Sequence, residues 1–122
     1  MIVIDYQDRR PIYEQIVEKF QILILNGILA ADEQMPSVRK LAMDLSINPN
    51  TIQKAYTMLE QQGYIYPVKG RGAFVAKKED LIQQKKEVYW KEYYHLIQKG
   101  REIGIEKEEF LEKVKEFWEV DL

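Results

Sequence analysis

One stretch decides the fold of this chain: Ser46-Ile47-Asn48-Pro49-Asn50-Thr51-Ile52-Gln53-Lys54-Ala55-Tyr56. Asn48 suits a helix N-cap because its side chain can accept a hydrogen bond from a free backbone N–H, and Pro49 suits the first helical position. A buried face is predicted by the helical spacing of Ile52, Ala55 and Leu59. The other face carries amides, a hydroxyl and an ammonium group, from Asn50, Thr51, Gln53 and Lys54. Such groups at an exposed helix start can read DNA base edges and hold phosphates; the alternative is an ordinary amphipathic surface helix.

The composition limits the classes of protein to which the chain can belong. It has 122 residues, of which 46% are hydrophobic, as expected for one domain or one domain with an appendage. It has no cysteine, so disulfides and thiolate metal sites are excluded and a reducing compartment is favoured. No apolar run approaches the roughly 20 residues that span a bilayer, and the N-terminus lacks the pattern of a signal peptide. We therefore expect a cytoplasmic protein without membrane association.

The charges are unevenly distributed along the chain. The formal net charge of −2 argues by itself against nucleic acid as a partner. Residues 36–76, however, have a local charge of +3, from Arg39, Lys40, Lys54, Lys69 and Arg71 against Asp44 and Glu60. Residues 1–35 and 79–122 come to −3 and −4. Positive charge therefore gathers in the same part of the chain as the polar helix, and a local patch can hold phosphates even on an acidic protein.

Two more helices are expected before the polar one. Apolar residues at helical spacing predict a scaffold helix from about Pro11 to Asn26, with Gly27 as the residue that ends it. Residues 28–35 are expected to be a connector, after which Ser37 caps a second short helix. This second helix and the polar helix would be joined by a tight turn, which predicts a helix-turn-helix, although many small helical domains contain two consecutive helices. Residues 2–4 could form a short strand, with no identifiable partner.

A β-hairpin is expected directly after the polar helix. Gly63 ends that helix in the left-handed conformation, and residues 64–68 and 73–75 are β-prone segments on either side of a turn. The turn reads Lys69-Gly70-Arg71-Gly72. Its glycines allow close approach to a sugar-phosphate chain, and its two basic residues supply charge. The order of elements predicts a mostly α fold, a winged helix-turn-helix with a small β-hairpin wing, over residues 1–76.

This arrangement resembles the DNA-binding domain of the GntR family of bacterial transcription regulators over residues 9–76. The matching segments occur in family order and at family spacing: Pro11-Ile12-Tyr13-Glu14-Gln15-Ile16, Met35-Pro36-Ser37-Val38-Arg39-Lys40-Leu41-Ala42, Asn48-Pro49-Asn50-Thr51-Ile52-Gln53-Lys54-Ala55-Tyr56, Leu59-Glu60, Gly63-Tyr64-Ile65 and Gly70-Arg71-Gly72-Ala73-Phe74-Val75. The Asn-Pro-Asn-Thr-Ile-Gln version, with a short C-terminal part, is similar to the YtrA-like subgroup.

The sequence departs from the family pattern in two places. Many members have an arginine-rich opening where Pro49, Asn50 and Gln53 stand here. Because Arg favours guanine whereas Asn and Gln favour adenine, the bases read should differ. The segment Ala31-Asp32-Glu33 replaces the more usual Pro-Gly-Asp. We expect that turn to survive because Asp tolerates the left-handed region better than most residues.

The resemblance implies roles for residues of the two helices. It implies a phosphate contact from Arg39 and contacts in the DNA groove from Asn50, Thr51 and Gln53. Asn48 would act mainly as a helix cap and also as a phosphate donor. The alternative for Thr51 is that it only supports the first helical turn.

The resemblance also implies a role for the wing. Arg71, with Gly70 and Gly72 on either side, would enter or edge the minor groove. Lys69 and Lys54 are also predicted to bind DNA, because of their charge and position and not because of the resemblance. The alternative for Lys54 is a solvated helix face.

Residues 77–122 have the pattern of a helical hairpin. A long charged helix is expected from Glu79 to about Gly100, followed by a break over residues 100–104 and a second helix from Glu106 to Glu119. This hairpin has more apolar surface than two helices can hide from water, so it must pack on the winged helix or on a second copy. We favour a homodimer, in which two reading helices meet an inverted repeat. The expected dimer interface comprises Tyr89, Trp90, Tyr93, Leu96, Ile97, Phe110, Val114, Phe117 and Trp118.

The sequence does not favour an enzyme, and no metal or cofactor is expected. His95 is the only histidine, and no P-loop, dinucleotide fingerprint or nucleophile elbow occurs. We expect a sequence-specific DNA-binding transcription regulator, a repressor that binds an inverted-repeat operator in double-stranded DNA as a homodimer. The YtrA-like resemblance implies a transporter operon as its target. The alternative is a winged-helix protein–protein interaction module.

An effector small molecule is not identifiable from the sequence. Longer GntR relatives carry a large effector-binding domain after the winged helix, and residues 77–122 are too short to form it. A slot between the aromatic helices is the remaining place for an effector, but an aromatic stripe at helical spacing is more often core.

Overall fold

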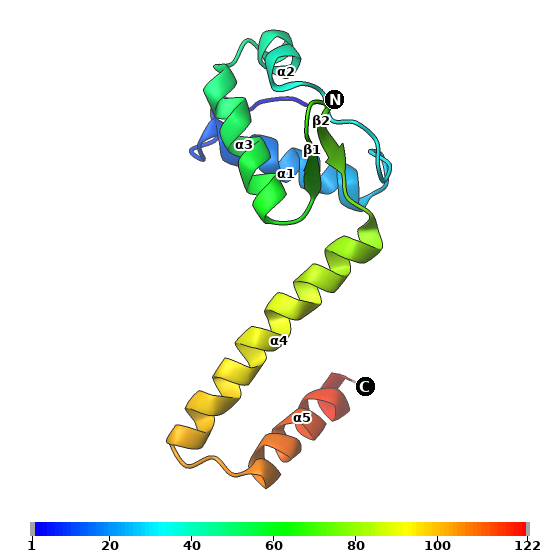
Figure 1. Ribbon diagram of the computed structural model, residues 1–122. Helices are drawn as coiled ribbons and strands as arrows, with labels where there is room; N and C mark the ends of the chain where they lie inside the picture. Colours follow the sequence, from blue (N-terminus) through cyan, green and yellow to red (C-terminus); the bar gives the residue numbers. More distant parts are fainter. Residues whose placement is uncertain (1, 122) are drawn as a thin grey trace. The chain divides into compact units, whose positions relative to one another are not determined.

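The structure is a computed structural model that describes residues 2–121 (Figure 1). Within this range the chain forms five helices and one two-stranded sheet: α1 (Ile12–Leu25), α2 (Val38–Leu45), α3 (Pro49–Gln61), β1 (Ile65–Val68), β2 (Gly72–Val75), α4 (Lys78–Glu102) and α5 (Lys107–Asp121). None of the helices in this range is long and apolar enough to cross a membrane. The chain divides within α4 into two compact units, Met1–Gln84 and Lys85–Leu122. The division into functional domains at residue 76 stays a prediction.

The core of the first unit lies where α1 and α3 pack against each other. Ile52, Ala55 and Leu59 are fully buried, which confirms the buried face predicted for the polar helix. On α1, Phe20 lies edge-on to the ring of Tyr56, with the ring centroids 5.8 Å apart. A buried aromatic pair in this orientation stabilises the contact beyond the area that it buries.

The predicted helix-turn-helix forms with the expected helix caps. The Ser37 hydroxyl accepts a hydrogen bond from Lys40 N at 3.0 Å at the start of α2. The turn is made by Ser46, which adopts a left-handed conformation with φ 55°, and Asn48 then caps α3. Because each free N–H at a helix start needs a partner, these caps determine where α2 and α3 begin.

The wing forms as predicted, and a further segment pairs with it. β1 and β2 are antiparallel, with Ile65 opposite Val75 and Val68 opposite Gly72. On the other edge of β2, Val75 N donates to Glu33 O at 2.8 Å, and Met35 N donates to Ala73 O at 2.8 Å. The end of the expected connector therefore runs as an extra strand-like segment beside the wing.

Asp32 makes the turn before this segment, with φ 65°. The prediction that the turn survives without the usual glycine is confirmed. The Tyr66 hydroxyl also donates to Asp32 Oδ1 at 2.7 Å. This hydrogen bond, more than burial, raises the pKa of Tyr66, which keeps the hydroxyl protonated as a donor.

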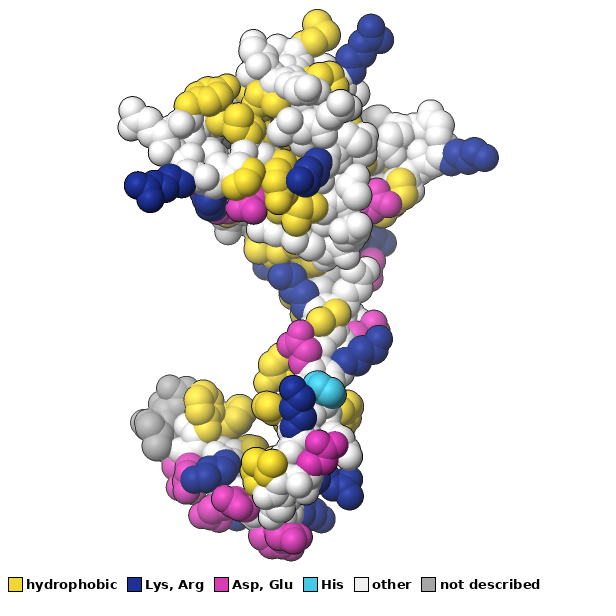
Figure 2. Space-filling model, turned by 90° about the vertical axis from the view of Figure 1, so that its left-hand side faces the viewer, with side chains coloured by type: hydrophobic (Ala, Val, Ile, Leu, Met, Phe, Trp, Pro, Cys, Tyr) yellow, Lys and Arg dark blue, Asp and Glu magenta, His cyan; other side chains and the backbone are white. Residues whose placement is uncertain are grey.

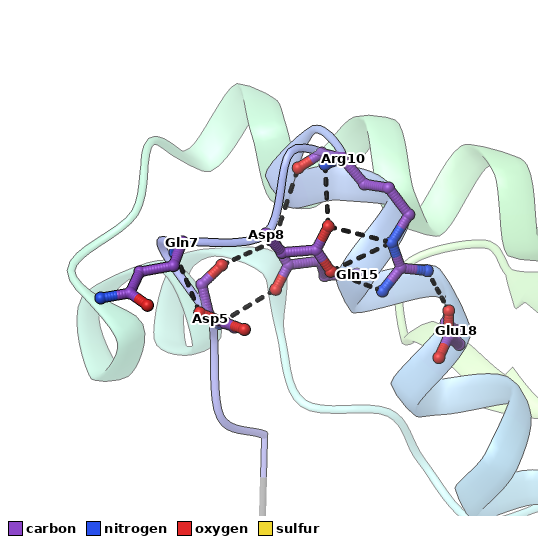
Figure 3. A network of polar contacts seen from close by, with 6 residues as sticks. All are labelled: Asp5, Gln7, Asp8, Arg10, Gln15 and Glu18. Carbon is purple, nitrogen blue, oxygen red and sulfur yellow. Dashed lines mark hydrogen bonds and ion pairs between the residues drawn. The ribbon is translucent and has the colours of Figure 1, made fainter.

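The N-terminal segment packs on α1 and is not a strand, so the strand considered for residues 2–4 was wrong. Ile2 lies in the core, and the backbone of Asp5 is bound by a side chain instead of a neighbouring strand. The buried Gln15 accepts from Asp5 N and donates to Asp5 O, both at 3.0 Å (Figure 3). A buried amide with both ends paired holds the segment in one place.

Arg10 is committed to acidic neighbours in the same region. Its guanidinium contacts Asp8 at 2.8 Å and also pairs with Glu18 (Figure 3). The hydrogen bond from Arg10 lowers the pKa of the Asp8 carboxyl. The positive charge of Arg10 is therefore already balanced within the protein.

The start of α4 belongs to the first unit. Leu81 is 0% exposed and lies in the core. Gln84 lies against the end of α3, since a Cβ atom at Gly63 would lie 2.0 Å from Gln84 Oε1. Gly63 also has φ 83°, a conformation that favours glycine, whereas the Gln84 side chain could move aside for a larger residue.

The second unit is a helical hairpin whose turn differs from the prediction in one respect. The expected break at Gly100 does not occur, because α4 continues to Glu102 and the chain turns at Ile103 and Gly104. Gly100 lies within the helix, and the Phe110 ring packs on it, since a Cβ atom there would lie 2.7 Å from Phe110 Cζ. This glycine permits close packing and does not end the helix.

We predict that Leu81→Ala lowers the free energy of unfolding by about 2–5 kcal/mol, because it leaves a cavity in a core that cannot fully collapse. The measurement is urea denaturation of the full chain at one fixed protein concentration. Val3→Ala is the control, since Val3 is 72% exposed and should change stability by less than about 0.5 kcal/mol. Equal, small effects of the two substitutions would show that the start of α4 is not part of the core.

Candidate nucleic-acid interface

The start of α3 presents polar side chains to solvent. Asn48 Oδ1 accepts a hydrogen bond from Asn50 N at 2.8 Å, so the role of Asn48 as a cap is confirmed. Asn50 and Gln53 are exposed, whereas Thr51 is half-buried. Gln53 Nε2 lies 3.4 Å from Thr57 Oγ1, a long hydrogen bond that leaves the amide available to another partner.

Lys54 points toward α1. Its Nζ atom lies 4.0 Å from the centroid of the Tyr13 ring, which is the geometry of a cation–π contact. The ammonium group therefore has a partner within the protein, at the edge of the polar face of α3.

The tip of the wing is built from the turn predicted in the sequence. Arg71 N donates to Val68 O at 2.9 Å and closes the turn. Gly70 and Gly72 have φ angles of 77° and 104°, which other residues rarely adopt. The Arg71 guanidinium lies 5.5 Å from the centroid of the Phe74 ring. Lys69 is exposed beside it, so two cations stand at the tip.

An open groove of about 410 Å³ separates α3 from the wing. It brings together five of the residues predicted to bind DNA, namely Gln53, Lys69, Gly70, Arg71 and Gly72. The other five lie outside its lining: Arg39, Asn48, Asn50, Thr51 and Lys54. Glu60 is the acidic residue of the lining, about two helical turns beyond Gln53, so the groove is most basic toward the wing tip.

Four consecutive residues, which we call the 34–37 segment, hold the parts of this surface together. Gln34 Nε2 donates to Arg71 O at 2.7 Å, and Met35 N donates to Ala73 O at 2.8 Å. The Pro36 carbonyl accepts from the hydroxyl of Tyr56 on α3 at 2.7 Å. Ser37 caps α2. Each residue of the 34–37 segment therefore binds an element of the surface, and all four line the groove.

Only one of these four contacts, the cap by Ser37, was predicted from the sequence. Ser37 carries the signature of a helix cap, but Gln34 is an exposed polar residue in a connector and shows no pattern. Tyr56 falls on the buried face of α3, and this position could have indicated that its hydroxyl needs a partner. Burial raises the pKa of Tyr56, so the hydroxyl stays protonated as a donor to Pro36.

The chemical groups that this surface presents differ from those of a metal site. Among residues 2–121, no group of three or more His, Cys, Asp or Glu side chains is placed to hold a metal ion. What the arrangement offers is amide groups, glycine backbone and cations around one open groove. These are groups that bind base edges and phosphates.

Comparisons with known proteins agree with this chemistry. The sequence model of the bacterial regulatory proteins of the gntR family matches residues 12–75. The HTH-type transcriptional repressor YtrA of Bacillus subtilis (strain 168) is 38% identical over 118 residues, which cover 95% of this chain and 91% of that protein.

Solved structures extend the comparison to the fold. YtrA from Sulfolobus acidocaldarius, a GntR-family transcription factor, has a TM-score of 0.60 and 34% identity over 72% of this chain and 93% of its own. The DNA-binding domain of AraR, solved in complex with operator ORR3, has a TM-score of 0.53 and 31% identity over 61% of this chain and 89% of its own. The neighbour thus binds operator DNA with the same kind of domain. This chain belongs to the GntR family, resembles its YtrA-like members, and is a DNA-binding transcription regulator with a winged helix-turn-helix.

Proposed function

We propose that this protein is a repressor that binds an inverted-repeat operator as a homodimer. The observation that carries the DNA-binding part is the groove between α3 and the wing, whose lining includes Gln53, Lys69 and Arg71. The name of the B. subtilis relative, a transcriptional repressor, supports the direction of regulation. The YtrA-like resemblance suggests a transporter operon as the target.

In this proposal, α3 reads bases and the wing binds the backbone or the minor groove. Asn50 and Gln53 carry amides, which can bond both N6 and N7 of adenine in the major groove. Arg39 and Asn48 would hold phosphates beside the start of α3. Lys54 would meet a phosphate and not a base, because its ammonium group is held against Tyr13.

The wing would add contact without strict base reading. Lys69 and Arg71 supply charge that replaces counterions on the DNA. A Cβ atom at Gly70 would meet no described atom within 4 Å, so the backbone there is open to a close approach. An Arg side chain also favours a narrow minor groove, where the negative potential is enhanced.

The second unit supplies the argument for a homodimer of the helical hairpin. Figure 2 shows hydrophobic side chains at the surface of the hairpin, among charged ones. Trp90, Phe117 and Trp118 are 48%, 65% and 63% exposed within one chain, and large aromatic side chains in such numbers mark an interaction surface. A second copy is the partner that would also align two reading helices with an inverted repeat. The proposed interface comprises Tyr89, Trp90, Tyr93, Leu96, Ile97, Phe110, Val114, Phe117 and Trp118.

The experiment that tests the proposed function is selection of bound duplexes from a random DNA pool by the full chain. Enrichment of an inverted repeat, with two half-sites about one or two helical turns apart, is the expected result. The selection is repeated with cell extract to supply any missing effector. Failure to enrich a sequence under either condition would contradict DNA reading and favour the protein-interaction alternative.

We predict that Asn50→Ala and Gln53→Ala each relax the base preference at a particular position of the half-site. Removal of one two-bond contact to a base should reduce discrimination there by about 1–3 kcal/mol. The measurement is competition binding with duplexes that carry single base changes. Gln61→Ala, an exposed glutamine at the end of the same helix, is the control. An unchanged base preference in both variants would remove these residues from the reading surface.

We predict that Phe117→Glu converts the dimer to a monomer, because it places a charge in an apolar interface. Sedimentation equilibrium measures the mass, and binding to the full inverted repeat should weaken more than binding to a single half-site. Lys115→Gln is the matched control, since it makes the same change in charge on the same helix outside the proposed interface. A mass that is equal for the wild type and both variants would contradict dimerisation through this face.

A further inference from the structure

The side chain of Gln34 makes a hydrogen bond to the tip of the wing, residues 69–71. Its Nε2 atom donates to Arg71 O at 2.7 Å, although the two residues are 37 positions apart in the chain. The same residue forms an isolated antiparallel bridge with Phe74. Gln34 is itself exposed, so the need to pair a buried amide does not explain this contact.

The tip has little else to hold it in place. Its turn is closed by the bond from Arg71 N to Val68 O, which lies within the hairpin. Among residues 2–121, the bond from Gln34 is the hydrogen bond that ties residues 69–71 to a segment outside the hairpin. A tip with Gly70 at φ 77° would otherwise sample many conformations.

Gln34 is also placed to fix the position of the Arg71 backbone, from which the Arg71 side chain extends. A Cβ atom at Gly72 would lie 3.5 Å from Gln34 Nε2, so the amide of Gln34 lies close to the backbone of Gly72, next to the tip. The Arg71 guanidinium lies over the ring of Phe74, which is the residue bridged to the backbone of Gln34. The carbonyl of Arg71 is thus held by the Gln34 side chain, and its guanidinium lies over a ring of the strand that pairs with residues 33–35.

We propose that Gln34 is a positioning residue for DNA binding, which holds Arg71 at a set distance from α3 before DNA arrives. The proposal rests on the proposed function, in which Arg71 contacts DNA. A tip that is ordered in the free protein loses less conformational freedom on binding, and this raises affinity without a new contact. Gln34 itself need not touch the DNA, because it acts through the backbone of Arg71.

The test is a double-mutant cycle of Gln34→Met and Arg71→Ala, measured as affinity of the full chain for the enriched duplex. Gln34→Met keeps the length of the side chain and removes its donor. It should weaken binding about 3- to 10-fold in the wild-type background, the range for one hydrogen bond. In the Arg71→Ala background it should weaken binding less than about 2-fold, because coupled residues are not additive. Gln61→Met, an exposed glutamine outside the groove lining, should leave affinity unchanged.

The outcomes separate this role from a general structural one and from the proposed function. The melting temperature of Gln34→Met should fall by no more than a few degrees, as expected for the loss of one exposed hydrogen bond, whereas a larger fall with proportional weakening of binding in both backgrounds would overturn the positioning role. Equal weakening in both backgrounds at an unchanged melting temperature would also overturn it. If Arg71→Ala binds DNA as well as the wild type, the wing contact itself is wrong and the positioning role falls with it.

Discussion

The proposed DNA-binding surface depends on the 34–37 segment, because this segment joins the elements that form that surface. The hydroxyl of Tyr56 on α3 donates to the Pro36 carbonyl, and Met35 N donates to a carbonyl of the wing. Ser37 caps the start of α2. Besides these bonds, α3 and the wing are joined by the short connection through residues 62–64, where Tyr64 N donates to Leu59 O at 2.9 Å, and by hydrophobic contacts. Hydrogen bonds have directions, so they set an orientation that apolar packing does not. When α3 and the wing keep one orientation relative to each other, their surface can match the grooves of a DNA duplex.

The electrostatics of the protein follow from the same arrangement. A protein with a formal charge of −2 is not attracted to DNA as a whole, so its cations must act where they gather. Arg10 is balanced by Asp8 and Glu18, whereas Lys54 and the wing-tip cations form no ion pair with any residue that the structure describes. Acidic residues elsewhere should oppose non-specific binding, so the proposed function assigns recognition to the wing and the start of α3.

Local rules predicted most of the fold, and they failed where distant segments meet. Asn48 and Ser37 were readable as caps because a cap depends on its nearest neighbours. The contact of Gln34 was not readable, because Gln34 shows no local pattern and its partner is a backbone carbonyl on the wing. Gly100 was misread as a helix break, since a glycine that accommodates a packed aromatic ring looks the same in sequence as one that ends a helix. The Lys54 contact with the Tyr13 ring depends on how α1 crosses α3, which periodicity does not specify.

DNA binding by the wing and α3 together is tested most directly by the affinity of the full chain for DNA, measured over a series of salt concentrations. For the wild type, the logarithm of affinity should fall linearly with the logarithm of salt concentration. Replacing Lys69 and Arg71 together by alanine should make that slope shallower, by about 0.9 for each phosphate that the variant no longer neutralises. An affinity that does not depend on salt, or a slope that the double substitution leaves unchanged, would contradict the claim that the wing and α3 together bind DNA.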